Sequence, residues 1–251
     1  MRRAMLVTTG PPPNFLGVTY VNNGGKSSSS TGTLDLTPPA STTIGDGLLM
    51  IRCMWNSNMT ANDVSGWTNL ADGTSGTGTA NGNHTSRIRM DFRVADGTES
   101  PFGITTTGGG TVSGQCGMIL RYANGTGHWE AVGCGSTVAG DTSHNGNRAT
   151  SDSGTFSVAP GDVLVAGIAI DVATGLAASA PNITVGGTGT GVGTVSWREN
   201  GVGFTDGNDG NIYVAEAPYS GTSKTGAGAF SMSSGIAQCG PVGFVRIREV
   251  A

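Results

Sequence analysis

The chain has 251 residues and a formal net charge of −4 at pH 7, with only 12% charged residues. It is long enough to bury roughly 70–75% of the surface that its unfolded form exposes, but this charge offers nothing to a nucleic acid. Its 44 glycines follow no G-X-Y period, which excludes collagen and favours a turn-dense, short-stranded all-β fold.

The N-terminus, MRRAMLVTTGPPP, predicts no signal peptide, because its apolar run covers only Ala4 to Val7. No run approaches the ~20 apolar residues that a membrane span needs, so no membrane association is expected. Residues 1–30 are expected to form an extended arm, since the proline run Pro11 to Pro13 favours polyproline II geometry and does not pair in a sheet. Such an arm is suited to reach a neighbouring subunit.

Two kinds of strand follow along the chain. The segments GLLMIRCMW (47–55) and DVLVAGIAID (162–171) are apolar on nearly both faces, which is typical of central strands. The segment RIRMDFRVA (87–95) alternates strictly, and this predicts a half-buried antiparallel strand. Its inward residues would be Ile88, Met90, Phe92 and Val94, and its outward residues Arg87, Arg89, Asp91 and Arg93. Segments 27–32, 73–85 and 135–153 carry almost no large apolar residue and are interpreted as surface loops.

The same order of segments occurs twice, in pseudo-repeats at about 40–125 and 155–249. GQCGMILRYANG (114–125) in the first half corresponds to AQCGPVGFVRI (237–247) in the second. In the same way, Gly45-Asp46 corresponds to Gly161-Asp162. The spacing is too long for a solenoid, so the halves are expected to complete one core. Residues 31–251 are therefore predicted to form a single antiparallel two-sheet sandwich of jelly-roll type.

Several short motifs resemble a domain type found in bacteriophage and bacterial genomes. They are Gly45 to Leu49, the Gly66-Trp67-Thr68 turn, the strand end Arg93 to Glu99, and Met118 to Tyr122. The resemblance covers roughly residues 40–249. It implies a virion protein, either a capsid decoration protein or a tail-fibre tip, usually trimeric.

The possible reactive groups are better explained as structural. The chain has no G-x-S-x-G motif that would supply the serine of a catalytic triad. The histidines are therefore interpreted as solvated: His84 and His144 in loops, and His128 at a strand start. Asp206, Asn208, Asp209 and Glu216 resemble a calcium loop, but Gly210 and Asn211 stand at its fifth and sixth positions, so a hairpin turn is preferred. The glycine-rich segments TGGGT and GGTGTGVG lack the ending of a phosphate loop.

Three further groups keep alternatives open. The four cysteines, Cys53, Cys116, Cys134 and Cys239, contain no C-x-x-C; buried free thiols are expected, with a Cys116–Cys239 bridge or a metal site as the alternatives. Of the four tryptophans, Trp55 and Trp197 are expected in the core, and no separate role is assigned to Trp129. Trp67 either packs a loop onto the sheet or binds a sugar. The row Arg87, Arg89 and Arg93 is either a solvated face or a contact with an acidic neighbour.

These observations predict a structural protein without catalytic, cofactor-binding or metal-binding residues. The expected role is a phage capsid decoration or cement protein that is assembled in the host cytoplasm and docks on the major capsid protein, or on other virion subunits, as a homotrimer. The alternative is a receptor-binding module that recognises a surface carbohydrate. An enzyme is not expected, because the carboxylates occur mostly singly in turns.

Overall fold

A computed structural model describes residues 15–24, 27–29, 33–55, 61–74, 86–106, 114–136, 147–171, 179–204, 210–233 and 241–251. In these ranges the regular structure consists of strands, and they contain no helix that could span a membrane. The strands are β1 (Phe15–Leu16), β2 (Thr19–Asn23), β3 (Ser27–Ser29), β4 (Thr33–Leu36), β5 (Gly47–Trp55), β6 (Thr68–Thr74), β7 (Ser86–Val94), β8 (Phe102–Thr105), β9 (Gln115–Ala123), β10 (His128–Ser136), β11 (Asn147–Val158), β12 (Val163–Asp171), β13 (Ser179–Val185), β14 (Ser196–Phe204), β15 (Gly210–Pro218), β16 (Lys224–Ser233) and β17 (Val242–Val250).

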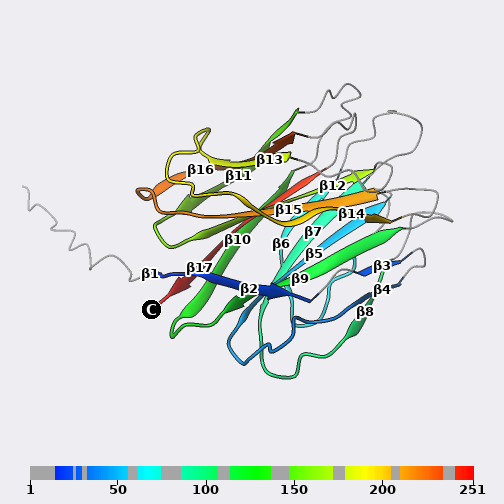
Figure 1. The fold of residues 1–251 in the computed structure, drawn as a ribbon. Helices are drawn as coiled ribbons and strands as arrows, with labels where there is room; N and C mark the ends of the chain where they lie inside the picture. The colour runs from blue at the N-terminus through cyan, green and yellow to red at the C-terminus, as the bar shows by residue number, and fades with distance from the viewer. Residues whose placement is uncertain are drawn as a thin grey trace, which may run out of the picture.

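The strands form four antiparallel sheets (Figure 1). Sheet I has the order β2-β9-β5-β7-β6, with β3 also paired to β9. Sheet II has the order β1-β17-β12-β15-β14, with β10 on the other edge of β17. A two-stranded cover, β4-β8, and a three-stranded cover, β11-β16-β13, complete the set.

The sheets are stacked in four layers, because both faces of each six-stranded sheet are apolar. In β12, Val163 and Val165 pack in the core between sheets I and II, whereas Leu164 and Ala166 pack in the core beneath the three-stranded cover. A third core lies between sheet I and the two-stranded cover. The two covers lie on opposite sides of the molecule in Figure 1. The all-β, antiparallel prediction is confirmed, but two facing sheets were expected and four are present; the jelly-roll relationship stays a prediction.

Sheets I and II approach closely where two glycines of sheet II lie side by side. Gly167 of β12 is the register partner of Gly243 of β17. A Cβ atom at Gly167 would lie 2.9 Å from both Met90 Cε and Ile88 Cδ1, and one at Gly243 would lie 2.8 Å from Met90 Sδ. The missing side chains make the hollow that the Met90 side chain fills, which is how a small residue on one sheet accommodates a large one on the next.

The described part of the N-terminal segment is extended and pairs with the body of the same chain. Phe15 and Leu16 pair with the end of β17 in sheet II, and residues 19–23 pair with β9 in sheet I. One short segment therefore joins the edges of both large sheets. The tip of the predicted arm, residues 1–14, lies outside the described residues.

The three segments interpreted as loops contain more strand than predicted. Residues 27–29 form β3, β6 continues to Thr74, and β10 and β11 take both ends of 135–153. These sequences lack apolar alternation because β3 is an edge strand and β11 belongs to an outer layer, where little hydrophobic surface is needed. The middle portions, 75–85 and 137–146, lie outside the described residues.

The two large sheets share one strand order. Sheet I reads β9-β5-β7-β6 and sheet II reads β17-β12-β15-β14. If the four strands of each sheet are numbered by their order along the chain, both sheets have the spatial order fourth, first, third, second. In each half an extra strand, β2 or β10, pairs with the outer edge of the last strand.

Candidate functional site

The Gly45-Asp46 turn before β5 is closed by the Asp46 side chain. Gly45 has a φ of 92°, a left-handed conformation that favours glycine. The Asp46 carboxylate accepts hydrogen bonds from the backbone N–H groups of Thr43 (2.8 Å) and Asn124 (2.9 Å) and from Arg121 Nε (2.6 Å). Burial raises the pKa of Asp46, but these hydrogen bonds outweigh it and hold the pKa below its usual value. The turn motif therefore serves to fix the start of β5.

The matching Gly161-Asp162 turn before β12 is built in the same way. Gly161 has a φ of 95°, and the Asp162 carboxylate accepts from the backbone N–H of Ala159 (2.7 Å). Arg248 of β17 supplies a two-pronged ion pair, at 2.6 Å and 2.8 Å. Each half thus uses an arginine from its last long strand to secure the aspartate of its first turn.

The strand end Arg93 to Glu99 forms a self-contained turn. Gly97 has a φ of 85°. The Glu99 carboxylate accepts from the backbone N–H groups of Asp96 (2.9 Å) and Gly97 (3.0 Å), while Asp96 accepts from the N–H and hydroxyl groups of Thr98. Arg93 Nη2 pairs with Asp96 (2.9 Å) and Glu99 (3.2 Å). Hydrogen bonds from Thr98 lower the pKa of Asp96, so this carboxylate is ionised at neutral pH.

The Gly66-Trp67 turn places an indole beside this strand end. Gly66 has a φ of 79°, and the backbone N–H of Trp67 donates to the backbone carbonyl of Val64 at 3.0 Å. The Trp67 ring is half-buried, lies 6.2 Å from the Phe102 ring and has the Arg93 guanidinium 5.7 Å from its centroid. Trp67 therefore packs its loop onto the sheet, which is the first of the two alternatives given for this residue.

A pocket of about 310 Å³ opens where these motifs meet. Leu48 of the first motif is the register partner of Arg93 of the third, so both side chains lie on the same face of sheet I. The lining residues are Pro38, Leu48, Val64, Ser65, Trp67, Arg93, Thr98, Glu99, Ser100, Phe102 and Gly103. Three of the four motifs that carry the phage resemblance thus contribute to one pocket.

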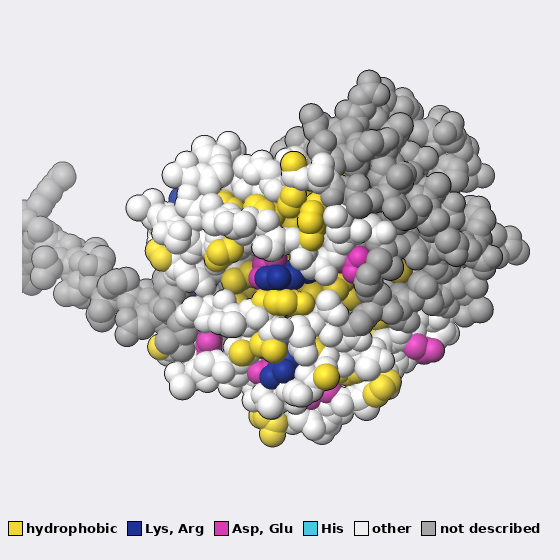
Figure 2. Space-filling view, viewed as in Figure 1, with side chains coloured by type: hydrophobic (Ala, Val, Ile, Leu, Met, Phe, Trp, Pro, Cys, Tyr) yellow, Lys and Arg dark blue, Asp and Glu magenta, His cyan; other side chains and the backbone are white. Residues whose placement is uncertain are grey.

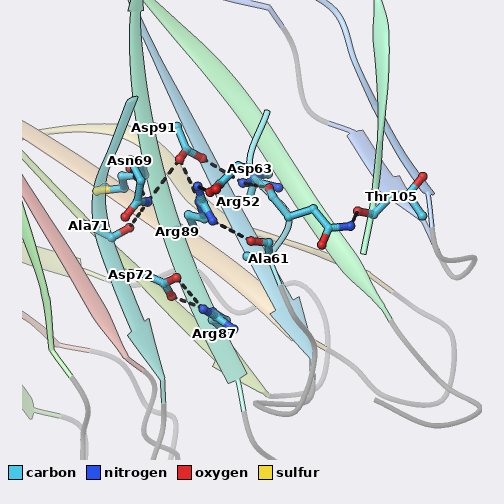
Figure 3. Close-up of polar contacts among 12 residues, drawn as sticks. Arg52, Ala61, Asp63, Asn69, Ala71, Asp72, Arg87, Arg89, Asp91 and Thr105 are labelled. Atoms are coloured by element: carbon cyan, nitrogen blue, oxygen red, sulfur yellow. Dashed lines mark hydrogen bonds and ion pairs between the residues drawn. The ribbon is translucent and has the colours of Figure 1, made fainter. Parts of the chain in front are cut away.

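Beside this pocket, the face of sheet I carries a buried ion network (Figure 3). Asp91 is fully buried and accepts from Arg52 Nη2 (2.9 Å), Arg89 Nε (2.8 Å) and Asn69 Nδ2 (3.2 Å). Burial lowers the pKa of Arg52, and Asp91 offsets only part of this effect. Figure 3 shows the three charged side chains pointing toward one another from the adjacent strands β5 and β7.

The loop of residues 61–67 covers this network. Arg89 donates to the Ala61 carbonyl at 2.6 Å and pairs with Asp63, and Asn62 Nδ2 donates to the Thr105 carbonyl of β8 at 2.7 Å. The outward row was predicted to be either solvated or in contact with an acidic neighbour; Arg89 is buried, and its acidic neighbours belong to the same chain. Asp63, in contrast, is exposed, and hydrogen bonding by Arg89 lowers its pKa.

A second polar cluster lies where the N-terminal segment crosses between the large sheets. Tyr122 is fully buried and donates to Glu216 Oε2 at 2.9 Å; Arg198 pairs with Glu216 at 2.7 Å and stacks 3.8 Å from the centroid of Tyr20. Burial, reinforced by Glu216, raises the pKa of Tyr122 well above its ordinary value. On the face drawn in Figure 2, hydrophobic side chains surround a basic side chain between β15 and β2.

The remaining candidate residues do not come together. His128 is exposed at the start of β10, while His84, His144, Asp206, Asn208 and Asp209 lie outside the described residues. Within the described part of the chain no three His, Cys, Asp or Glu side chains could hold one metal ion. Of the two glycine-rich segments, GGTGTGVG (186–193) forms turns and isolated bridges, and TGGGT (107–111) lies outside the described residues.

The cysteines and the other tryptophans are located in or beside the cores where their side chains are described. Cys53 and Cys116 are register partners on β5 and β9, and both are buried thiols, as expected. Trp197 packs beneath the three-stranded cover, 6.2 Å from Phe230. Trp129 packs against Phe92 and donates to the Gly45 carbonyl at 2.7 Å. The side chains of Trp55 and Cys134 lie outside the description, as does all of Cys239.

No protein-family model matches this chain, and neither the curated proteins nor the solved structures give a significant match. The function proposed below therefore rests on the chain's own residues.

Proposed function

We propose that this chain is a structural protein of a bacteriophage virion, a capsid decoration or cement protein that docks on the shell as a homotrimer. The observation that carries the proposal is the use of charge in the turns. Asp46, Asp162 and Glu99 accept hydrogen bonds from backbone N–H groups and pair with arginines of their own half. These groups stiffen the ends of a four-layer stack, which suits a rigid docking module.

We further infer that the stack is a repeated unit used twice. The equal strand orders of sheets I and II and the matching Gly-Asp turns support this inference. A unit of this kind has its long strands covered on one face only, so each half needs the other to bury its second apolar face.

The oligomer and the partner are tested separately. Light scattering on the purified chain should give three times the 25.1 kDa chain mass, and a monomer at micromolar concentration would contradict the trimer. Virion particles from the producing host should contain the chain at a fixed ratio to the major capsid protein. Deleting residues 1–14 should weaken binding of the chain to particles that lack it, if the tip of the arm contacts a neighbour. Absence of the chain from purified particles would end the virion proposal.

A receptor-binding role is the second candidate, and the pocket beside Trp67 favours it. An aromatic ring that lines a partly polar hollow at one end of a sandwich is a common way to hold a small ligand.

A further inference from the structure

The pocket beside Trp67 combines an apolar part with hydrogen-bonding groups. Trp67, Phe102 and Leu48 supply the apolar part, and the indole is held by its contacts with Phe102 and Arg93. Glu99 and Ser100 line the same space. Its volume of about 310 Å³ is at the lower end of the range for small-molecule pockets, which is about 300–1,000 Å³.

The two charged residues that line this pocket, Arg93 and Glu99, are paired with each other before any ligand arrives. Arg93 Nη2 pairs with Asp96 at 2.9 Å and with Glu99 at 3.2 Å. The Glu99 side chain is only 6% exposed and is oriented by two backbone N–H groups. A site with paired charges and pre-oriented polar groups favours a neutral ligand that both donates and accepts hydrogen bonds.

A second pocket of about 240 Å³ adjoins the first, since Pro38 and Glu99 line both. It is lined by Ser41, Thr42 and other small polar or proline residues of 37–42 and 97–101. Together the two spaces have room for two rings on the part of the surface that contains Pro38 and Glu99.

From these features we propose that the paired pockets form a binding site for a neutral sugar at least two rings long. A pyranose ring has an apolar C–H face that packs against an indole and a rim of hydroxyl groups that suits Arg93, Glu99 and Ser100. An anionic ligand would need an unpaired cation, and a proline-rich peptide would leave the polar groups of the pocket without partners. The site deepens the receptor-binding candidate and does not depend on docking to a capsid.

Ligand-observed saturation-transfer NMR on the full chain tests the site. The probes are maltose, lactose, N,N′-diacetylchitobiose and the corresponding methyl monosaccharides. We expect saturation transfer to at least one disaccharide, strongest at the ring protons of one sugar face, and weaker transfer to its monosaccharide. Trp67→Ala should weaken that binding by at least about tenfold, which corresponds to about 1.4 kcal/mol.

Because Trp67 also packs on the core of the two-stranded cover, a second variant tests the pocket without removing core contacts. Ser100 is exposed and lines the first pocket, so Ser100→Trp should fill the pocket, abolish saturation transfer and leave the unfolding midpoint unchanged. Trp197→Phe, in a different core, is the matched control and should bind as the unmodified chain does.

Three results would overturn the proposal: no transfer to any disaccharide, transfer that survives Ser100→Trp, or a proline-rich peptide that binds with the same dependence on Trp67. Light scattering and particle composition are separate measurements, so failure of sugar binding leaves the virion proposal standing, and the reverse also holds.

Discussion

Replacing Asp91 with asparagine should destabilise the protein far more than the same change at Asp72. Asp91 and Arg52 have side chains 0% and 1% exposed, and Asp91 also neutralises Arg89. The amide would keep the size of the side chain but lose its charge, leaving the buried Arg52 guanidinium without its counter-charge while Arg89 keeps Asp63, and this costs about 3–5 kcal/mol. Asp72 pairs with Arg87 on the same face, but these side chains are 26% and 21% exposed, and such a pair contributes at most about 1 kcal/mol.

Urea denaturation at pH 7, followed by circular dichroism, measures the free energy of unfolding of each variant. In thermal unfolding of a chain of this length, Asp91→Asn should lower the melting temperature by roughly 6–20 °C and Asp72→Asn by less than about 4 °C. Adding Arg52→Met to Asp91→Asn should recover part of the loss, because the uncompensated charge of Arg52 is removed. Equal losses for the two single variants, within about 0.5 kcal/mol, would refute the view that Asp91 acts as a buried counter-charge.

Three further outcomes are expected. Gly66→Ala should cost about 1–2 kcal/mol in urea denaturation, because Gly66 has a φ of 79° and a Cβ there meets no atom within 4 Å, so the cost is conformational; Ser65→Ala on the same loop should be neutral within about 0.5 kcal/mol. Since the pKa of Asp46 is lowered in the folded protein, its stabilising effect should be complete above its unfolded pKa of about 3.9 and lost as the pH falls below that value; Asp46→Asn should flatten this part of the stability profile, and an unchanged profile would contradict the assignment. Cys53 and Cys116 should react with iodoacetamide only after unfolding, as peptide mapping would show, and rapid labelling of the native chain would contradict their burial.

Strand β7 illustrates what alternation can and cannot predict. Ile88, Met90 and Phe92 face the central core, as the period of two requires. Val94 was predicted to face inward but is 47% exposed, because it ends the strand. The outward residues were expected either to contact water or to meet an acidic neighbour; Asp91 and Arg89 are buried against each other, since the loop of residues 61–67 folds over them. A charged row with an aspartate between arginines was the available signal for this internal pairing.

The number of layers could not be predicted because the outer strands are hydrophobic on one face at most. In β16, KTGAGAFSMS, only Phe230 and Met232 belong to the core beneath the three-stranded cover, and in β4 the apolar residues are Leu34 and Leu36. Such strands need few large side chains, so their sequences read as glycine- and serine-rich loops. The central strands β5 and β12 were recognised because both of their faces are buried.

The pocket was only partly predictable. Trp67 was singled out from its turn, but Glu99 and Ser100 were not recognised as its neighbours. Their proximity depends on the register of β5 against β7 and on the turn that Gly97 allows, and neither is visible in one sequence.

The position of β17 has a consequence for biosynthesis. It follows the other described strands in chain order, yet it lies inside sheet II, between β10 on one edge and β12 and β1 on the other. The C-terminus accordingly lies next to β1 (Figure 1). Sheet II therefore cannot be completed during synthesis until β17 has left the ribosome, and β1 has no partner strand before then. Folding of this sheet should be slow, because β1 and β17 are far apart in the sequence, and a variant that lacks β17 should leave an open sheet for chaperones and proteases to recognise.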